Sequence, residues 1–150
     1  MKPISKFEGP VWRIIPSADL AEPGLPARAP VGRFHHSGQI AIYASLSAEG
    51  AGIAIRRYLS DGVARMLVPM WLSVERAADE SANRAASVVW QDLHAAGKPS
   101  PTWAYSDAAR ELGAEAMLYA SRSRPDLSHV VIFSPGKLRP AGPALPFNPG

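Results

Sequence analysis

The sequence contains no cysteine among its 150 residues. This absence excludes a disulfide framework, a thiolate zinc site and a cysteine nucleophile. It leaves the redox compartment open, and it fits a cytosolic protein. Any chemistry must therefore come from arginine, histidine, tyrosine, serine and carboxylate side chains.

Long apolar runs are absent as well. No run approaches the roughly 18 residues that a membrane span needs. The N-terminal segment MKPISKFEGPVW lacks the basic stretch, long apolar run and small-residue cleavage site of a signal peptide. We therefore expect a cytoplasmic protein.

The motifs of several common enzyme classes are also missing. The sequence has no P-loop, no G-x-G-x-x-G after a strand, no H-E-x-x-H and no G-x-S-x-G. These absences exclude the usual signatures of nucleotide-binding loops, zinc hydrolases and serine hydrolases.

The positive charge is modest and dispersed. Sixteen lysine and arginine residues against thirteen acidic ones give a net charge of +3. Because the basic residues form no block or stripe, we do not expect direct nucleic-acid binding. A small phosphate-bearing ligand or an acidic partner explains the surplus equally well.

The length and the 47% hydrophobic content fit one compact domain over residues 1–150. Apolar runs predict strands over 11–15, 40–45, 66–74, 116–120 and 129–133, and helical spacing predicts helices over 47–59, 81–96 and 106–112. Clustered prolines predict an irregular loop over 16–30 and a surface tail from about residue 139. Since strands and helices do not alternate regularly, we expect an α+β domain with central β-sheets flanked by short helices.

Single residues refine these elements. Ser47 and Ser106 are expected to be helix N-caps, and Gly113 is expected to end the helix over 106–112. Pro69 cannot donate a ladder hydrogen bond, which predicts an edge position or a bulge. The first helix should leave Arg56 and Arg57 nearer solvent and bury Ala51, Ala54, Ile55, Tyr58 and Leu59. The helix over 81–96 should group Ala85, Val88, Val89 and Leu93 on one side.

The densest polar cluster is the segment GRFHHSG at residues 32–38, between the proline-rich loop and the strand that holds Tyr43. His35 and His36 are adjacent, so on an extended segment they point to opposite faces, and we expect no metal site there. Arg33 is either a surface arginine or a bidentate phosphate clamp. Tyr43 fits a core tyrosine or one that stacks on a ring, and Ser121 fits an ordinary strand-to-loop serine.

Three segments together resemble one family. VWRIIP, GRFHHSGQIAIYASLSAEGA and EAMLYASRSRPDLSHVVIF, in this order and spacing, resemble the RES-domain family of bacterial toxins over residues 11 to about 138. The resemblance implies a fold similar to ADP-ribosylating toxins, NAD as substrate without a metal, and a helix-turn-helix (Xre-type) antitoxin as partner.

The resemblance also implies roles for individual residues. It places Arg13, Arg33, Tyr43 and Ser121 in the NAD cleft. One departure stands out: where the family commonly has a glutamate, eleven residues after Tyr43, this chain has Ala54. Two residues are candidate replacements for that glutamate, Glu49 and His36.

The implied activity is mono-ADP-ribosyl transfer from NAD to a host protein, possible acceptors including a metabolic enzyme, with growth arrest as the outcome. Two alternatives stay open at this point. The chain could deplete NAD as a glycohydrolase or phosphorylase, or it could be a catalytically decayed module that binds NAD or a partner.

Overall fold

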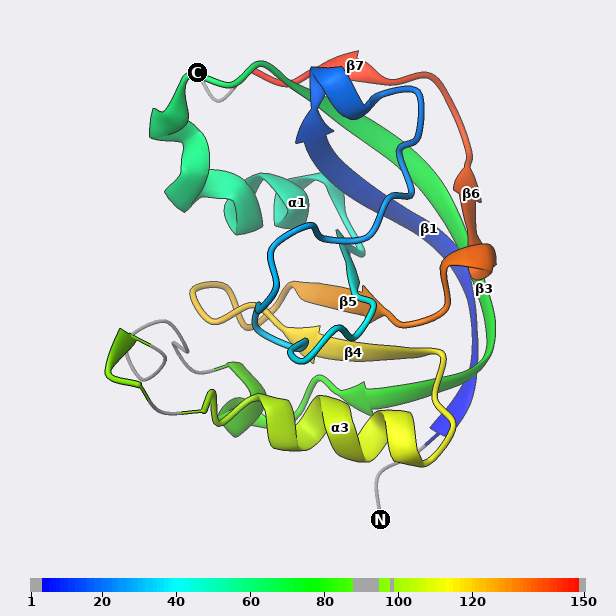
Figure 1. Ribbon diagram of the computed structural model, residues 1–150. Helices are drawn as coiled ribbons and strands as arrows, with labels where there is room; N and C mark the ends of the chain where they lie inside the picture. The colour runs from blue at the N-terminus through cyan, green and yellow to red at the C-terminus, as the bar shows by residue number, and fades with distance from the viewer. Residues whose placement is uncertain (1–3, 88–94, 98, 149–150) are drawn as a thin grey trace.

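The computed structural model describes residues 4–87, 95–97 and 99–148 (Figure 1). Within these ranges the strands are β1 (Ile4–Pro16), β2 (Ile42–Ser45), β3 (Arg65–Glu80), β4 (Ala116–Ala120), β5 (Ser128–Ile132), β6 (Leu138–Pro140) and β7 (Leu145–Pro146). The helices are α1 (Ala48–Ile55) and α3 (Trp103–Glu111), with 3-10 turns η1 (Ser17–Asp19), η2 (Arg56–Asp61), η3 (Arg84–Ser87) and η4 (Pro135–Lys137). This combination confirms the predicted α+β class.

The described strands form one sheet in the order β1-β2-β5-β4-β3-β6, with β7 also paired to β3. Because β1 pairs with β3 as well as with β2, the strands β1, β2, β5, β4 and β3 close into a ring. The prediction of more than one central sheet was therefore wrong, since the described strands form a single sheet that closes on itself. Figure 1 shows β1 and β3 as a long curved pair on one side of this ring.

The pairing of β1 with β3 builds the main core. It is antiparallel and runs from Ile4 opposite Ala78 to Pro16 opposite Arg65. Alternate β3 residues are buried, as a strand with one covered face requires: Val68, Met70, Leu72 and Val74. Both strands are longer than the apolar runs that predicted them, because their ends carry polar residues that a hydrophobicity pattern does not extend through.

The predicted edge position or bulge at Pro69 was wrong. Pro69 lies inside β3, opposite Trp12 of β1, and the shift in the β1–β3 register falls elsewhere, between Ser5 and Phe7. The carbonyl of Pro69 accepts a hydrogen bond from the amide of Ala141 at 3.1 Å. Since the nitrogen and carbonyl of a strand residue face the same side, the missing N–H faces the end of β6 and not the long ladder with β1.

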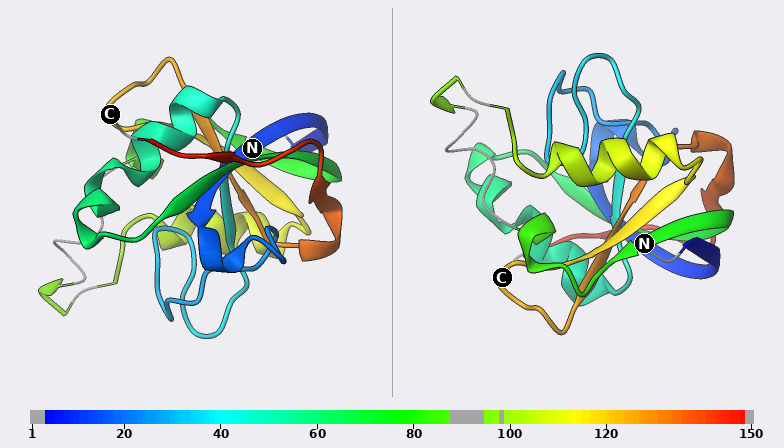
Figure 2. Two further views of the ribbon diagram at one scale, coloured as in Figure 1. Left: turned by 90° about the horizontal axis from the view of Figure 1, so that it is seen from above. Right: turned by 90° about the horizontal axis from the view of Figure 1, so that it is seen from below.

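A second apolar cluster lies between the sheet and α3, which runs alongside β4 (Figures 1 and 2). Its fully buried members are Phe34, Met117 and Val131. The predicted strand over 116–120 is confirmed, and the one over 129–133 is β5, shifted by one residue. Phe34 therefore anchors the polar segment 32–38 to the same core that supports α3.

The start of α1 was predicted correctly and its buried face was not. The hydroxyl of Ser47 accepts from the amide of Gly50 at 2.9 Å, which confirms the N-cap. Of the five residues expected to be buried, only Ala51 is, whereas Ala54 and Tyr58 are exposed. The reason is that this face borders a cavity instead of packing on the core.

Two further helix predictions need correction. Residues 81–87 form a turn and η3, in which Asp79 accepts from the amide of Ser81 and Asn83 from that of Ala85, so side chains compete with helical bonding. Residues 88–94 of the expected helix lie outside the described residues. Ser106 lies inside α3, where its hydroxyl donates to the carbonyl of Trp103, and the cap position belongs to Thr102.

The proline-rich end follows the surface, as predicted, and is also paired. β6 lies against β3 at Met70 to Leu72, and β7 lies against Met66 and Leu67. Most of its side chains are exposed. No helix within the described residues has the length and apolar character needed to cross a membrane.

Candidate functional site

A cavity of about 590 Å³ opens between β1, α1 with η2, the segment 27–35 and the adjoining ends of β4 and β5. Its volume lies in the range of small-molecule sites. The charged residues on its described wall are all arginines: Arg13, Arg33, Arg56 and Arg122. With no carboxylate on that wall, the cavity suits an anionic ligand, and planar guanidinium groups suit phosphate oxygens in particular.

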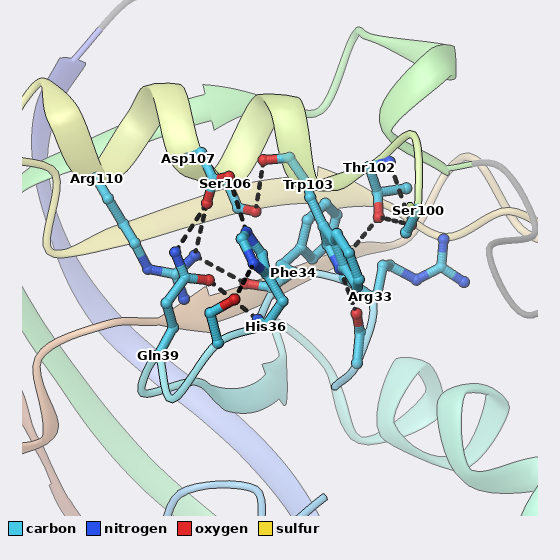
Figure 3. A network of polar contacts seen from close by, with 12 residues as sticks. Arg33, Phe34, His36, Gln39, Ser100, Thr102, Trp103, Ser106, Asp107 and Arg110 are labelled. Carbon is cyan, nitrogen blue, oxygen red and sulfur yellow. Dashed lines mark hydrogen bonds and ion pairs between the residues drawn. The ribbon is translucent and has the colours of Figure 1, made fainter. Parts of the chain in front are cut away.

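The segment that carries Arg33 is held from outside the cavity by α3 (Figure 3). The indole Nε1 of Trp103 donates to the carbonyl of Gly32 at 2.8 Å, and the hydroxyl of Thr102 donates to the carbonyl of Arg33. Arg110 donates to the carbonyl of Phe34 at 2.9 Å. Three consecutive carbonyls are therefore bound, which positions the Arg33 side chain; in Figure 3 its guanidinium points away from this network.

His36 belongs to that outer network and does not line the cavity. Its Nε2 lies 2.9 Å from Oδ2 of Asp107, and its ring stacks on Trp103 with centroids 4.5 Å apart. Gln39 donates to the other oxygen of Asp107 at 2.9 Å. Burial acts to raise the pKa of Asp107, but the hydrogen bonds from Gln39 and His36 outweigh it and lower that pKa. His36 thus ties the loop to α3.

Tyr43 and His35 form a chain of hydrogen bonds on the cavity wall. His35 Nε2 lies 2.8 Å from the carbonyl of Ala29, so Nε2 must carry the proton and Nδ1 accepts from the hydroxyl of Tyr43 at 2.8 Å. The Tyr43 hydroxyl in turn accepts from the amide of Phe34 at 2.9 Å. Burial raises the pKa of Tyr43, although the bond from Phe34 opposes this. Tyr43 therefore stays neutral and holds the loop with its hydroxyl.

Arg13 is partly committed to backbone carbonyls. Its Nε donates to the carbonyl of Tyr43 at 2.9 Å, and its Nη1 donates to the carbonyls of Pro23 and Leu25 at 2.5 and 3.2 Å. Burial lowers the pKa of Arg13 to about 10, while the carboxylate of Asp19 opposes the shift. The side chain is thus charged at neutral pH, lines the cavity, and holds the proline-rich loop in place.

Ser121 directly follows β4 and is buried, with its hydroxyl accepting from the amide of Arg124 at 3.3 Å. It lines the cavity together with Arg13, Arg33 and Tyr43. The structure therefore brings together the four residues that the family resemblance assigned to one cleft. Their roles toward a ligand stay a prediction.

Glu49 is not brought to this site. Its side chain is 62% exposed at the start of α1 and pairs with Arg124 at 3.6 Å. Ala54, to which the family resemblance assigned the position of the glutamate, does line the cavity. Neither predicted replacement for that glutamate, Glu49 or His36, lies on the described cavity wall.

The wall residues that the sequence analysis missed include Tyr119 and His129. His129 Nδ1 lies 2.7 Å from the hydroxyl of Ser45, and its ring centroid is 5.4 Å from that of Tyr119. Burial, helped by the charge of Arg33, lowers the pKa of His129 to about 4. Tyr119 precedes Ser121 by two residues, so the period of a strand could have placed both side chains on one face. A lone histidine in the apolar run SHVVIF gave a weaker signal.

The buried His129 predicts a specific acid sensitivity. In the unfolded chain this histidine takes up a proton near pH 6.5, whereas in the folded chain it does so only near pH 4. Stability is therefore full above pH 6.5 and is lost as the pH falls between these values. We expect the wild type to lose about 3 kcal/mol more than His129→Asn between pH 6.5 and 4. Urea unfolding across this range measures the difference, and parallel pH curves for the two proteins would contradict it.

Comparison with known proteins identifies the family. Residues 10–148 match the model of the RES domain, and the chain belongs to this family, which confirms the membership predicted from its three segments. Seven chains of solved structures match. One comes from the crystal structure of the M. tuberculosis MbcT-MbcA toxin-antitoxin complex, with a TM-score of 0.71 and 18% identity over 97% of this chain and 87% of that chain. At this identity the likeness shows the fold alone. No curated protein sequence matches the chain.

Proposed function

We propose that this chain is the toxin of a toxin–antitoxin pair, and that it cleaves NAD and transfers ADP-ribose to a protein acceptor. The observation that supports this most is the cavity, whose charged wall residues are all arginines. NAD carries two negative charges on its pyrophosphate, which planar guanidinium donors bind well. Membership in the RES family supports the same substrate.

In this proposal the arginines provide binding and orientation. Arg33 binds the pyrophosphate. Arg13, in β1, adds its positive charge to the cavity while it keeps its hydrogen bonds to the carbonyls of Tyr43 and Pro23. Tyr43 packs beside the nicotinamide ribose, and Ser121 donates a hydrogen bond at the nicotinamide end. Held in this way, the bond from ribose C1′ to the nicotinamide nitrogen breaks first, and nicotinamide leaves with the bonding electrons.

The acceptor then attacks C1′ and loses its proton to solvent. No carboxylate lies on the described wall to stabilise the oxocarbenium-like carbon or to activate water. A protein acceptor supplies a nucleophilic side chain of its own, so transfer to a protein does not require a carboxylate on the wall to activate water. The same observation favours one second candidate, phosphorolysis, because inorganic phosphate is already anionic and is attracted by four arginines.

Nicotinamide release by the purified chain tests this proposal. The assay is run with NAD alone, with NAD and phosphate, and with cell lysate containing labelled NAD. A labelled protein band supports ADP-ribosyl transfer, and release that depends on phosphate supports phosphorolysis. Release in plain buffer indicates a glycohydrolase. If no nicotinamide is released but NAD raises the melting temperature, the chain is a binding module and the enzymatic proposal is wrong.

An antitoxin partner is part of the same proposal. The structural neighbour is described as a toxin–antitoxin complex, and family resemblance implies a helix-turn-helix antitoxin. Such a partner would neutralise the toxin by covering the mouth of the cavity near Arg33. Co-expression with the gene product encoded beside this chain tests this: a stable complex that no longer releases nicotinamide is expected, and an active complex would contradict it.

A further inference from the structure

Two buried polar atoms of the cavity wall lack a protein partner. Within the described residues, neither the hydroxyl of Tyr119 nor Nε2 of His129 makes a hydrogen bond. Tyr119 is 7% exposed and His129 is 6% exposed. Buried polar groups are almost always paired, so two unpaired neighbours on the wall of one cavity point to a ligand as their partner.

His129 offers this ligand a neutral donor. The hydroxyl of Ser45 is buried and its hydrogen-bond partner among the described residues is His129 Nδ1. If Ser45 donates its proton to Nδ1, both atoms are satisfied; the reverse arrangement would leave the hydroxyl proton without an acceptor. Nε2 then carries the imidazole proton. Because the pKa of the ring is low, it is uncharged at neutral pH.

Tyr119 offers a second neutral donor beside the first. Burial raises the pKa of Tyr119 to about 12, so its hydroxyl keeps its proton. Its ring lies against that of His129 with a centroid distance of 5.4 Å. Ser121 follows on the same face of β4 and also lines the cavity. This part of the wall thus presents uncharged donors, whereas the charged residues of the described wall are the four arginines.

We infer that Tyr119 and His129 form a subsite for uncharged oxygen atoms of the nicotinamide nucleoside half of NAD. This inference rests on the proposed function and adds the orientation of the substrate. The nicotinamide ring of NAD is cationic, so guanidinium groups repel it while neutral donors do not. The ribose hydroxyls and the carboxamide oxygen supply the acceptors, and the pyrophosphate is left to the arginines.

Calorimetric binding of three probes tests the subsite: nicotinamide mononucleotide, AMP and carba-NAD, whose glycosidic bond resists cleavage. Tyr119→Phe and His129→Asn are each expected to weaken the binding of nicotinamide mononucleotide and of carba-NAD by about fivefold, which is the effect of one lost neutral hydrogen bond. AMP binding should not change. Tyr105→Phe, in α3 outside the cavity, removes a tyrosine hydroxyl as the matched control.

A stability measurement separates a binding role from a structural one. Since the Tyr119 hydroxyl has no partner in the described protein, Tyr119→Phe should unfold at the same or a higher temperature than the wild type. Weaker binding of AMP with unchanged binding of nicotinamide mononucleotide would overturn the inference. Unchanged binding of all three probes would overturn it as well. In both cases the proposed function survives. A wild type that binds none of the probes would overturn both.

Discussion

Gly32→Ala is expected to destabilise the fold by about 4 kcal/mol and to abolish ligand binding in the cavity. A Cβ at this position would lie 2.7 Å from Nδ1 of His35 and 3.0 Å from the Tyr43 hydroxyl, and nearer still to Cε1 of His35. His35 cannot turn aside without breaking its hydrogen bonds to Ala29 and Tyr43. The backbone cannot move away freely, because Trp103 holds the carbonyl of Gly32.

Thermal unfolding checks this expectation, with a fall in Tm of roughly 12 °C for a protein of this size. Gly136→Ala is the matched control, since an added Cβ there meets no atom within 4 Å and the backbone has no positive φ. Carba-NAD binding measured below the Tm of the variant tests the second part. A Gly32→Ala protein that melts within about 2 °C of the control would show that the wall tolerates a methyl group.

Elements that depend on a few neighbouring residues were predictable from the sequence. The apolar run AMLYA predicted β4, and Ser47 predicted the start of α1, because strand burial and N-capping are decided by nearby residues. The closure of the sheet into a ring was not predictable. It depends on β1 pairing with β3 between residues that lie about 50 to 70 positions apart in the sequence, and no local pattern encodes such a register.

The same distinction applies to the candidate site: some of its residues could be predicted from the sequence, and others depend on contacts that only the fold creates. Resemblance to a family could place Arg13, Arg33, Tyr43 and Ser121 in one cleft, since each lies in a segment that the family shares. His129 could not be found in this way, because its importance comes from Ser45 on another strand and from an unpaired ring nitrogen. Glu49 was chosen for its nearness in sequence to the missing glutamate, and the first turn of α1 turns it toward Arg124 instead.

Arg33→Ala is expected to lower nicotinamide release by about a hundredfold to a thousandfold, the usual cost of losing one preorganised electrostatic contact. Ser121→Ala should reduce it comparably if its hydroxyl acts at the nicotinamide end. Folding should survive both changes. The hydrogen bond from Thr102 to residue 33 uses the backbone carbonyl, which alanine retains, and Phe34 keeps its place in the core.

The charge of Arg33 supplies a readout that does not depend on activity. Its guanidinium lowers the pKa of both His129 and Tyr119. Arg33→Ala should therefore raise the pKa of His129, which NMR titration of the imidazole protons can follow. Arg139→Ala on the exposed strand β6 removes the same charge outside the cavity, so it should change neither nicotinamide release nor this pKa.

Arg33→Lys separates charge from shape. Lysine keeps the positive charge but loses the planar pair of donors that binds two phosphate oxygens at once. We expect nicotinamide release between the values for the wild type and Arg33→Ala, with the pKa of His129 close to that of the wild type. Full activity in Arg33→Lys would mean that Arg33 acts only through its charge. Full activity in Arg33→Ala, with the pKa of His129 raised, would show that the residue lies in the cavity without binding the substrate.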